Sequence, residues 1–531
     1  MPNHMIILFV ALPMAAGILS LMLHRFHRAQ RVIGVTALLA NVAIGVWALA
    51  TVLNPASRIL TSQMGNWPAP FGITIVVDPL AAIMLSICAI VCFAVYVYCI
   101  SQLTGKHQGG YFHPLYHLLI FGVQWSFITG DLFNLFVAFE IMLMASYAVF
   151  IIGTSREQMR QAYKYILLNL IGSTMFVTCA GLLYGQLGTL NMADITRIAM
   201  AGELPATSIP VIALLVLVFG GKTAIFPLWY WLPDTYHTLP AALGGLFAGL
   251  LTKVGAYVMI RVFVMMFGLS GPVVDVVKPI LLVSAGVTMF LGVLGAVSMH
   301  TVRSILAIHI ISQVGYMIMG IALAIGLGIA VESRELAVAG AIFFIIHNMV
   351  VKCSLFLCGG LIHEHAGSDD LNKIGGLVRR APWLATLFLI AALSLAGLPP
   401  LSGFFGKFLL IREGFGQGHY VLVGFALATS LLTLLSMLKI WSYGFWSPAP
   451  PEVQYVRNPA HRPRTAGGIA GIALLVIVAL TMGLGAPLYV KASRIAAQSL
   501  IDPTPYVAAV LGEQYVGDET PRLAKVIEHD E

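Results

Sequence analysis

The sequence contains few charged residues. Only 10% of its 531 residues are Asp, Glu, Lys or Arg, whereas 59% are hydrophobic, and the mean hydropathy is +0.91. A soluble globular domain would carry about a quarter of its residues as charged side chains. This scarcity of charge excludes an ordinary soluble protein and indicates that the chain folds in a membrane.

Cysteine is also scarce. The chain has six cysteines: Cys88, Cys92, Cys99, Cys179, Cys353 and Cys358. All six lie inside apolar runs, where a thiol packs like a small apolar side chain, and none has the loop spacing of a zinc or iron–sulfur motif. In His363-Glu364-His365, side chains at i and i+2 on a helix point apart, and the same motif in a flexible loop would need more ligands. We therefore expect no cofactor and no metal on this chain.

Long apolar runs fill most of the sequence. About fourteen of them, between Ile6 and Tyr489, are long enough for a helix to cross about 30 Å of hydrocarbon. They are continuously apolar, whereas a membrane β-barrel needs alternating segments of about ten residues. The predicted fold is therefore an all-α polytopic membrane protein, and the first run is interpreted as a retained helix, not a cleaved signal peptide.

The basic residues predict an orientation. Loops after odd-numbered runs hold most of the Lys and Arg, among them Arg25, Arg28, Arg31, Arg379 and Arg380. Because basic loops stay on the cytoplasmic side, we expect both termini on the outer face of a bacterial inner membrane. The net charge of +7 then follows from topology, and no nucleic-acid partner is expected.

The chain contains a weak internal repeat. Four residue pairs recur at similar offsets: Asn169 and Asn348, Cys179 and Cys358, Lys222 and Lys407, Lys253 and Lys439. With five helices in each copy, the second copy would run in the opposite direction through the membrane. Inverted repeats place ion sites near the midplane at discontinuous helices.

This repeat divides the chain into five parts. We expect N-terminal transmembrane helices in residues 1–110, the first repeat in 111–270 and the second in 271–447. A last transmembrane helix in 448–490 precedes a tail, 491–531, for which no function is indicated.

A proline is expected to break the seventh helix, in the first copy. Pro227 cannot donate to the carbonyl of Thr223 and crowds it, so the helix should open one turn beyond Lys222. Backbone groups without partners are tolerated at membrane depth only beside protein or water. The break therefore marks either a hydrated cavity or a plain proline kink.

The second copy contains a similar break, in the twelfth helix. Pro399 and Pro400 should release the carbonyls of Leu395 and Ala396, which lie on the same predicted helix as Lys407. The same two alternatives apply here.

Ionisable residues inside the predicted spans are few, and each costs roughly 2.5 kcal/mol or more near the bilayer centre. Glu140 is the only carboxylate well inside a span. The bases are Lys222, Lys253, His309, His347, Lys352, Lys407 and Lys439. Burial lowers the pKa of a lysine and a nearby carboxylate raises it, while histidine titrates near neutral pH. Such a set can hold and pass protons, with water bridging helices whose axes are about 8–10 Å apart.

Structural ion pairs or snorkelling side chains are the alternative explanation. It applies most to Lys352, Lys439 and His309, and Arg261 is expected to snorkel. Asp78 and Asp131 stand where a carboxylate favours a helix N-terminus. Asp234 lies in a predicted loop without basic residues and is expected to cap a short helix.

Three segments resemble a known family. They are the stretch from Asn134 to Glu140, the stretch Gly221-Lys222-Thr223-Ala224-Ile225-Phe226-Pro227 continuing to Asp234, and Leu250-Leu251-Thr252-Lys253-Val254-Gly255. Together they resemble the antiporter-like membrane subunits of respiratory complex I, membrane-bound hydrogenases and Mrp-type cation/proton antiporters. The segments 247–253 and 401–415 are most similar to the D-type subunits of the Mrp antiporters.

The resemblance implies a fold of fourteen helices with two inverted five-helix repeats and a polar line across the midplane. On that line Glu140 and Lys222 form a pair, Lys253 connects, His347 continues and Lys407 is the terminal base; these five residues are called the midplane relay below. Some relatives carry glutamate at the position of Lys407. Lys352, Lys439, His309 and Asp234 are secondary candidates.

Three functions fit these features. The first is a proton-translocating subunit of a multi-subunit Na⁺ (or K⁺)/H⁺ antiporter, a transporter and not an enzyme, with other subunits and membrane lipid as partners. The second is a proton-pumping subunit of a complex I-like NADH:quinone oxidoreductase or a membrane-bound hydrogenase. The third, a structural scaffold, does not explain the buried ionisable residues.

Overall fold

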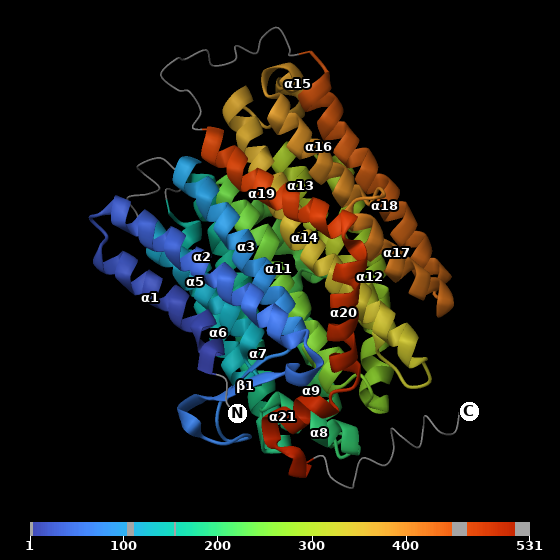
Figure 1. Cartoon of the computed structure of the whole chain (residues 1–531). Coiled ribbons are helices and arrows are strands. Elements are labelled where there is room, and N and C mark those ends of the chain that lie inside the picture. The colour runs from blue at the N-terminus through green and yellow to red at the C-terminus, as the bar shows by residue number, and fades with distance from the viewer. Residues whose placement is uncertain (1–3, 103–110, 153–154, 449–464, 516–531) are drawn as a thin grey trace.

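The computed structural model describes residues 4–102, 111–152, 155–448 and 465–515, and most of these residues lie in helices packed side by side (Figure 1). In this part of the chain, twelve helices are long and apolar enough to cross a membrane. The predicted helical membrane fold is confirmed. The number fourteen stays a prediction, because α5 (Phe112–Ile128) has only 17 residues and the predicted twelfth span is divided into two helices of 15 residues.

The N-terminal part consists of three long helices and a short hairpin. The helices are α1 (Leu8–Met22), α2 (His27–Val52) and α3 (Pro79–Gln102). Between α2 and α3, β1 (Leu60–Gln63) pairs antiparallel with β2 (Thr74–Val77), with Leu60 opposite Val77.

The segment predicted as the first repeat begins with α5. It continues with α6 (Leu132–Phe150), α7 (Arg156–Leu187), α8 (Met192–Ala201), α9 (Ser208–Thr223), α10 (Trp231–Tyr236) and α11 (Ala241–Ile260). The predicted cap at Asp131 is confirmed, because its carboxylate accepts from the N–H of Asn134 at 2.7 Å at the start of α6. A π-helical turn, Arg261–Met266, extends α11.

The helices of the segment predicted as the second repeat and the C-terminal helices follow. They are α12 (Gly271–Ser298), α13 (Val302–Ala324), α14 (Val331–Ala366), α15 (Leu377–Arg380), α16 (Pro382–Ala396), α17 (Ser402–Gly416), α18 (Tyr420–Ile440), α19 (Thr465–Leu484), α20 (Ala486–Ile501) and α21 (Thr504–Leu511). A π-helical turn, Trp441–Trp446, extends α18, as one extends α11.

Further local features recur in the two repeats. Asp131, before α6, forms a bridge with Asn191, and Thr301, before α13, forms one with Asp370. The residue after Asn191 begins α8, at the bottom of Figure 1, whereas α15 follows Asp370 at the top. The corresponding bridges thus lie at opposite ends of the bundle, as inverted repeats require.

The repeat alignment holds for one pair of residues and is wrong for another. Asn169 on α7 and Asn348 on α14 each donate to the carbonyl four residues earlier, at 2.9 Å and 2.8 Å. By contrast, Lys222 precedes the break of its helix, whereas Lys407 follows the break of the other. The two lysines are therefore not equivalent, and their similar offset in the sequence is misleading.

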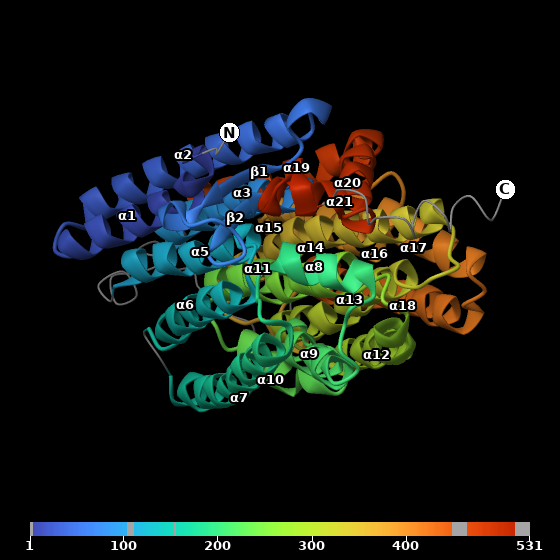
Figure 2. The ribbon, with the colours of Figure 1, turned by 90° about the horizontal axis from the view of Figure 1, so that it is seen from below.

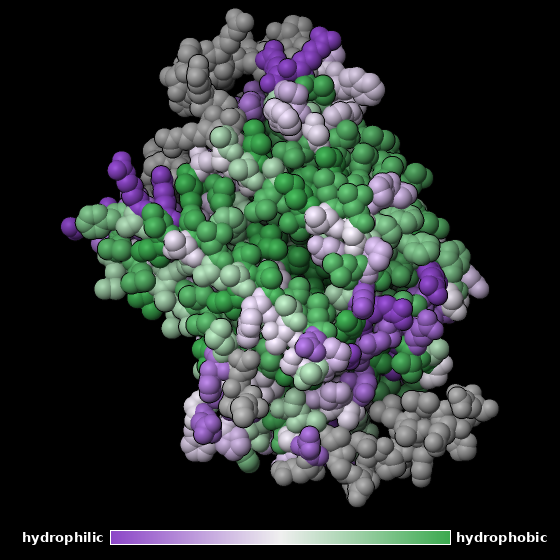
Figure 3. Space-filling view, in the orientation of Figure 1, coloured by the Kyte–Doolittle hydropathy of each residue, from purple (hydrophilic) through white to green (hydrophobic). Residues whose placement is uncertain are grey.

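The surface has the polarity of a membrane protein. Hydrophobic side chains cover the middle of the face in Figure 3, and hydrophilic ones gather toward the ends. The start of α1 and the end of α21 lie at the same end of the bundle (Figure 1), consistent with both termini on one side. Seen from below, α1 and α2 form one edge, whereas α11 and α14 lie in the interior (Figure 2).

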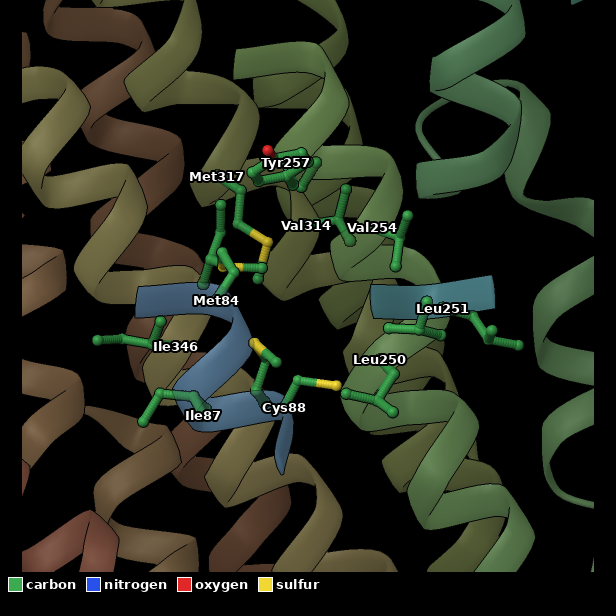
Figure 4. Packing of buried hydrophobic residues seen from close by; sticks show 14 of the residues in the cluster. Met84, Ile87, Cys88, Leu250, Leu251, Val254, Tyr257, Val314, Met317 and Ile346 are labelled. Atoms are coloured by element: carbon green, nitrogen blue, oxygen red, sulfur yellow. The ribbon is translucent and has the colours of Figure 1, made fainter. Parts of the chain in front are cut away.

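An apolar layer fills the interior between α3, α11, α13 and α14. Figure 4 shows Met84 and Cys88 of α3 close to Leu250 of α11 and to Met317 of α13, and all four side chains are buried. The cysteines are free and buried, as expected for packing residues. This layer packs the four helices tightly against one another.

The predicted tail is partly helical. Residues 486–501 and 504–511 form α20 and α21, and α20 packs along α14. Arg494 of α20 forms an ion pair with Glu335 of α14 at 2.6 Å. Residues 516–531 of the tail and 449–464 of the preceding part lie outside the described residues.

Candidate functional site

The first predicted helix break is confirmed. α9 ends at Thr223, and Ala224 adopts a left-handed conformation with φ of 65°. The freed backbone groups find partners: Trp231 Nε1 donates to the carbonyl of Gly221 at 3.0 Å, and the N–H of Phe226 donates to Thr288 Oγ1 at 2.9 Å. At this break, other groups of the protein therefore replace the helical hydrogen bonds that are lost.

Lys222 lies one residue before this break and is buried. Its Nζ donates to Ser173 Oγ at 3.2 Å and to the carbonyl of Asn169 at 3.4 Å, both on α7. Nζ also lies 5.9 Å from the ring centroid of Phe139. The lysine is therefore held by α7, although only Glu140 was predicted as its partner.

Glu140 is half-buried on α6, next to Phe139. Its Oε1 is buried without a hydrogen-bond partner in the described part of the chain. Glu140 and Lys222 form no ion pair among the described residues, but Lys222 Nζ lies against the ring of Phe139, the residue before Glu140. The predicted pair is thus brought into one neighbourhood but not into direct contact.

Lys253 is fully buried on α11. Its Nζ donates to the carbonyl of Ala248 at 2.6 Å and to Thr252 Oγ1 at 3.1 Å. Both acceptors belong to its own helix, so the amine lies close to the helix backbone. Neither acceptor carries a charge.

The second predicted break is confirmed as well. α16 ends at Ala396, and α17 begins at Ser402. Lys407 Nζ donates to the released carbonyls of Leu395 and Ala396, at 3.1 Å and 2.8 Å, and to Ser430 Oγ at 3.1 Å. The two carbonyls that the prolines were predicted to release are therefore hydrogen-bond acceptors of this lysine.

His347 on α14 lies at the same break. Its Nδ1 is 2.8 Å from Ser402 Oγ, and Ser402 Oγ is 3.0 Å from Ser394 Oγ. Gly403 is needed here, because a Cβ at this position would lie 2.0 Å from the carbonyl oxygen of Ser394 and 3.0 Å from His347 Nε2. The second break thus brings together His347 and the backbone that holds Lys407.

Among the secondary candidates, Lys352 and His309 are buried in the interior. Lys352 Nζ donates to the carbonyl of Leu306 at 3.3 Å. His309 Nδ1 is 3.3 Å from Ser312 Oγ, and its Nε2 has no partner among the described residues. Both lie between α13 and α14, which pack against each other.

Lys439 and Asp234 have structural partners. Lys439 Nζ donates to the carbonyls of Val297 and Met299, at 3.0 Å and 2.7 Å, and so satisfies the end of α12. Asp234 was predicted in a loop as a helix cap. Instead it lies within α10 and forms an ion pair with Lys164 of α7 at 3.0 Å, because the segment after Pro227 turns back into a helix.

Arg261 does not snorkel, contrary to the prediction. Its guanidinium is buried and forms a bidentate ion pair with Asp78, with Nη1 2.6 Å from Oδ2 and Nη2 bonded to Oδ1. Asp78 also caps α3 through the N–H of Ala81, at 2.9 Å, as predicted. The ring of Tyr506 covers the guanidinium, with its centroid 5.6 Å from Cζ. Asp78 was predicted at a span entrance and Arg261 as a snorkelling side chain, so their pairing was not predicted.

The described residues contain no candidate metal site, because no three His, Cys, Asp or Glu side chains lie close enough together to hold an ion. In the His363-Glu364-His365 segment, His363 Nδ1 is 4.0 Å from Asp369. That carboxylate accepts from Arg303 Nε at 2.7 Å, which holds the pKa of Asp369 below its usual value against the opposing effect of burial.

Similarity to known proteins extends over most of the chain. Residues 129–433 match the family described as NADH:quinone oxidoreductase/Mrp antiporter, transmembrane. The chain is 41% identical over 513 residues to the D-type Na⁺/H⁺ antiporter subunit of Alkalihalophilus pseudofirmus, covering 96% of this chain and 100% of that protein. It is 35% identical to the D-type Na⁺/H⁺ antiporter subunit of Bacillus subtilis, with the same coverage.

A solved structure has the same fold. A chain in the structure of the Mrp complex from Dietzia sp. DQ12-45-1b superposes with a TM-score of 0.85 at 30% sequence identity, covering 96% of this chain and 99% of that chain.

Proposed function

Because the chain belongs to the NADH:quinone oxidoreductase/Mrp antiporter transmembrane family, we propose that it is the D-type, proton-translocating subunit of a multi-subunit Na⁺ (or K⁺)/H⁺ antiporter. The observation that carries this proposal is the whole-length similarity to two antiporter subunits. The family also includes NADH:quinone oxidoreductase subunits, but both of these relatives are antiporter subunits, which favours the antiporter over the complex I-like alternative.

The helices that carry the midplane relay are neighbours. α6 packs against α7, α7 against α9, α9 against α11, α11 against α14, and α14 against α17. Each residue of the relay therefore lies one or two helices from the next. In our proposal, protons move along this line through water that bridges the side chains.

The hydrogen-bond partners of the lysines suggest different tasks. An ammonium has three N–H donors, whereas a neutral amine has two donors and a lone pair. Lys407 has three acceptors, which suits the charged form. Lys222 and Lys253 have two acceptors each, which suits either form. We propose that Lys222 and Lys253 pass protons on and that Lys407 holds one.

Lys222→Ala and Lys253→Ala should each reduce transport more than Lys439→Ala. The first two remove a proton-carrying group, whereas Lys439 only satisfies the carbonyls at the end of α12. Lys222→Arg should not rescue, because guanidinium does not release a proton near neutral pH. Everted vesicles with a pH-sensitive dye measure the exchange when Na⁺ or K⁺ is added. If Lys439 alone proved essential, the proposed relay would be wrong.

Partner subunits should be required for exchange. The buried set has several bases and a single midspan carboxylate, which makes a poor ligand set for a bare cation, and coupling needs two sites that bias the same states. We propose that the cation path lies at an interface with, or within, another subunit. The purified single chain in proteoliposomes should therefore insert but show no exchange. Exchange in a preparation that mass spectrometry shows to be free of companion subunits would contradict this.

The proposed location is a bacterial inner membrane, with both termini on the outer face. The basic turn between α1 and α2 then faces the cytoplasm, as does α15 with Arg379 and Arg380.

A further inference from the structure

A second group of buried ionisable residues lies where α5 packs against α3, outside the midplane relay, and no motif in the sequence marks it. His113 and His117, one helical turn apart on α5, are both buried. His113 Nε2 and both ring nitrogens of His117 have no hydrogen-bond partner among the described residues. Buried polar groups are rarely left without partners, so two adjacent imidazoles in this condition call for a functional explanation.

Aromatic rings surround the two imidazoles. The ring of Tyr96, on α3, lies 5.6 Å from that of His113 and 5.8 Å from that of His117. Tyr116 lies 6.1 Å from His117 on its other side. Aromatic faces attract a cation placed within about 6 Å of the ring centroid. Aromatic rings of this kind can therefore lie beside a charged imidazole, which aliphatic side chains could not stabilise in the same way.

Hydrogen bonds connect His113, by way of Tyr96, to Gln30 in the first turn of α2. Tyr96 Oη is 2.7 Å from His113 Nδ1 and 3.3 Å from the carbonyl of Gln30. The side chain of Gln30 is 3.1 Å from Nδ1 of the exposed His27. If Tyr96 donates to Nδ1, Nε2 of His113 carries the N–H; if Tyr96 accepts from Nδ1, Nε2 carries the lone pair. In both tautomers Nε2 has no partner among the described residues.

Gly34 makes this connection sterically feasible. A Cβ on Gly34 of α2 would lie 2.0 Å from Tyr96 Oη, so only glycine lets the hydroxyl reach between α2 and α5.

We propose that His113 and His117 form a proton-binding site, distinct from the midplane relay, that exchanges protons with the proposed cytoplasmic surface by way of the Tyr96 hydroxyl. The carbonyl of Gln30 orients this hydroxyl, and water beyond it supplies the proton that replaces the one passed to His113. The ionisable groups around it are His27 and Arg31 from α2, Tyr96, Cys92 and Cys99 from α3, and Tyr116 from α5. α1 and β2, which also pack against α5, contain no ionisable side chain.

α6 and α11 are the other helices packed against α5. Their ionisable residues are Glu140 and Tyr147 on α6 and Lys253 and Tyr257 on α11. Tyr257 bonds to the carbonyl of Phe127, near the far end of α5.

The site is mechanically linked to the helix of Glu140. At Gly122, α5 approaches α6 so closely that a Cβ would lie 2.5 Å from the backbone nitrogen of Met142. A proton gained by His117 therefore places a charge on the helix that packs directly against the helix of Glu140. Because these two helices pack so closely, we expect loading of this site to shift the pH dependence of transport.

The test is a titration of the purified complex with ¹⁵N-labelled histidine, followed by nuclear magnetic resonance. His113→Gln and His117→Gln assign the two imidazoles, because each removes one signal. Between about pH 9 and about pH 4 at least one of the two should change reversibly from neutral to charged. Two imidazoles that both stay neutral in the unmodified protein throughout this range would overturn the proposal.

The path is tested by Tyr96→Phe and Gly34→Ala, which keep both histidines. Each should slow protonation of His113 after a pH jump by at least about tenfold, as loss of a positioned proton-transfer group does. In vesicles, His117→Gln should shift the pH profile of transport, whereas the exposed-surface control His300→Gln should not. Unchanged protonation rates in both path variants would show that protons do not enter by Tyr96.

Discussion

Glu140→Gln should reduce cation/proton exchange to the background of vesicles that lack the chain, while the complex still assembles. Glutamine keeps the size of the side chain but cannot carry the charge that acts on Lys222. Because Oε1 of Glu140 is buried without a partner among the described residues, the neutral amide should cost little stability. The measurement is dye recovery in everted vesicles after Na⁺ or K⁺ is added, together with the yield of assembled complex.

A matched control is Glu157→Gln, which neutralises an exposed carboxylate at the start of α7 and should leave exchange unchanged. Glu140→Asp, which keeps the charge on a shorter side chain, should retain part of the activity. Exchange near the wild-type level in Glu140→Gln would remove Glu140 from the relay.

Asp78→Asn should destabilise the chain by about 3–5 kcal/mol, because it leaves the guanidinium of Arg261 buried without a counter-charge. The ion pair is nearly inaccessible to solvent, with side-chain exposures of 4% and 1%, so solvent screening weakens it little. Thermal inactivation of the complex, and the amount of folded chain recovered from membranes, measure the loss.

Two further variants separate the buried charge from other effects. Asp78→Leu combined with Arg261→Met should recover much of the stability, since it removes both charges. Asp194→Ala, which breaks a partly exposed pair with Arg197, should cost at most about 1 kcal/mol. If Asp78→Asn were as stable as the wild type, Arg261 would have another counter-charge or would reach water.

Helix breaks could be predicted from the sequence because proline acts locally. Its missing N–H and its ring affect the carbonyl one turn earlier whatever the tertiary structure. The positions of both breaks, and the release of the carbonyls of Leu395 and Ala396, were therefore predictable. The all-α membrane fold was predictable for a similar reason, since the length of an apolar run is a local property.

Contacts between helices could not be predicted in the same way. An apolar run has no polar stripe that shows which face of the helix meets a neighbour. The sequence therefore could not predict that Lys222 donates to groups on α7. Lys222 and Lys407 have a similar spacing to other repeat pairs, yet they lie on opposite sides of their breaks. Asp78 and Arg261 are 183 residues apart, and a local pattern cannot join them.

The Asp78–Arg261 pair has a consequence for biosynthesis. A ribosome delivers Asp78 at the start of α3, long before Arg261, and the ring that covers the pair, Tyr506, belongs to α21 near the end of the described chain. The early helices must therefore wait in the bilayer with an unpaired carboxylate until α11 arrives, and the site is not closed until translation is almost complete. A chain truncated before α11 would lack the counter-charge of Asp78, and we expect it to be less stable in the membrane than the full chain.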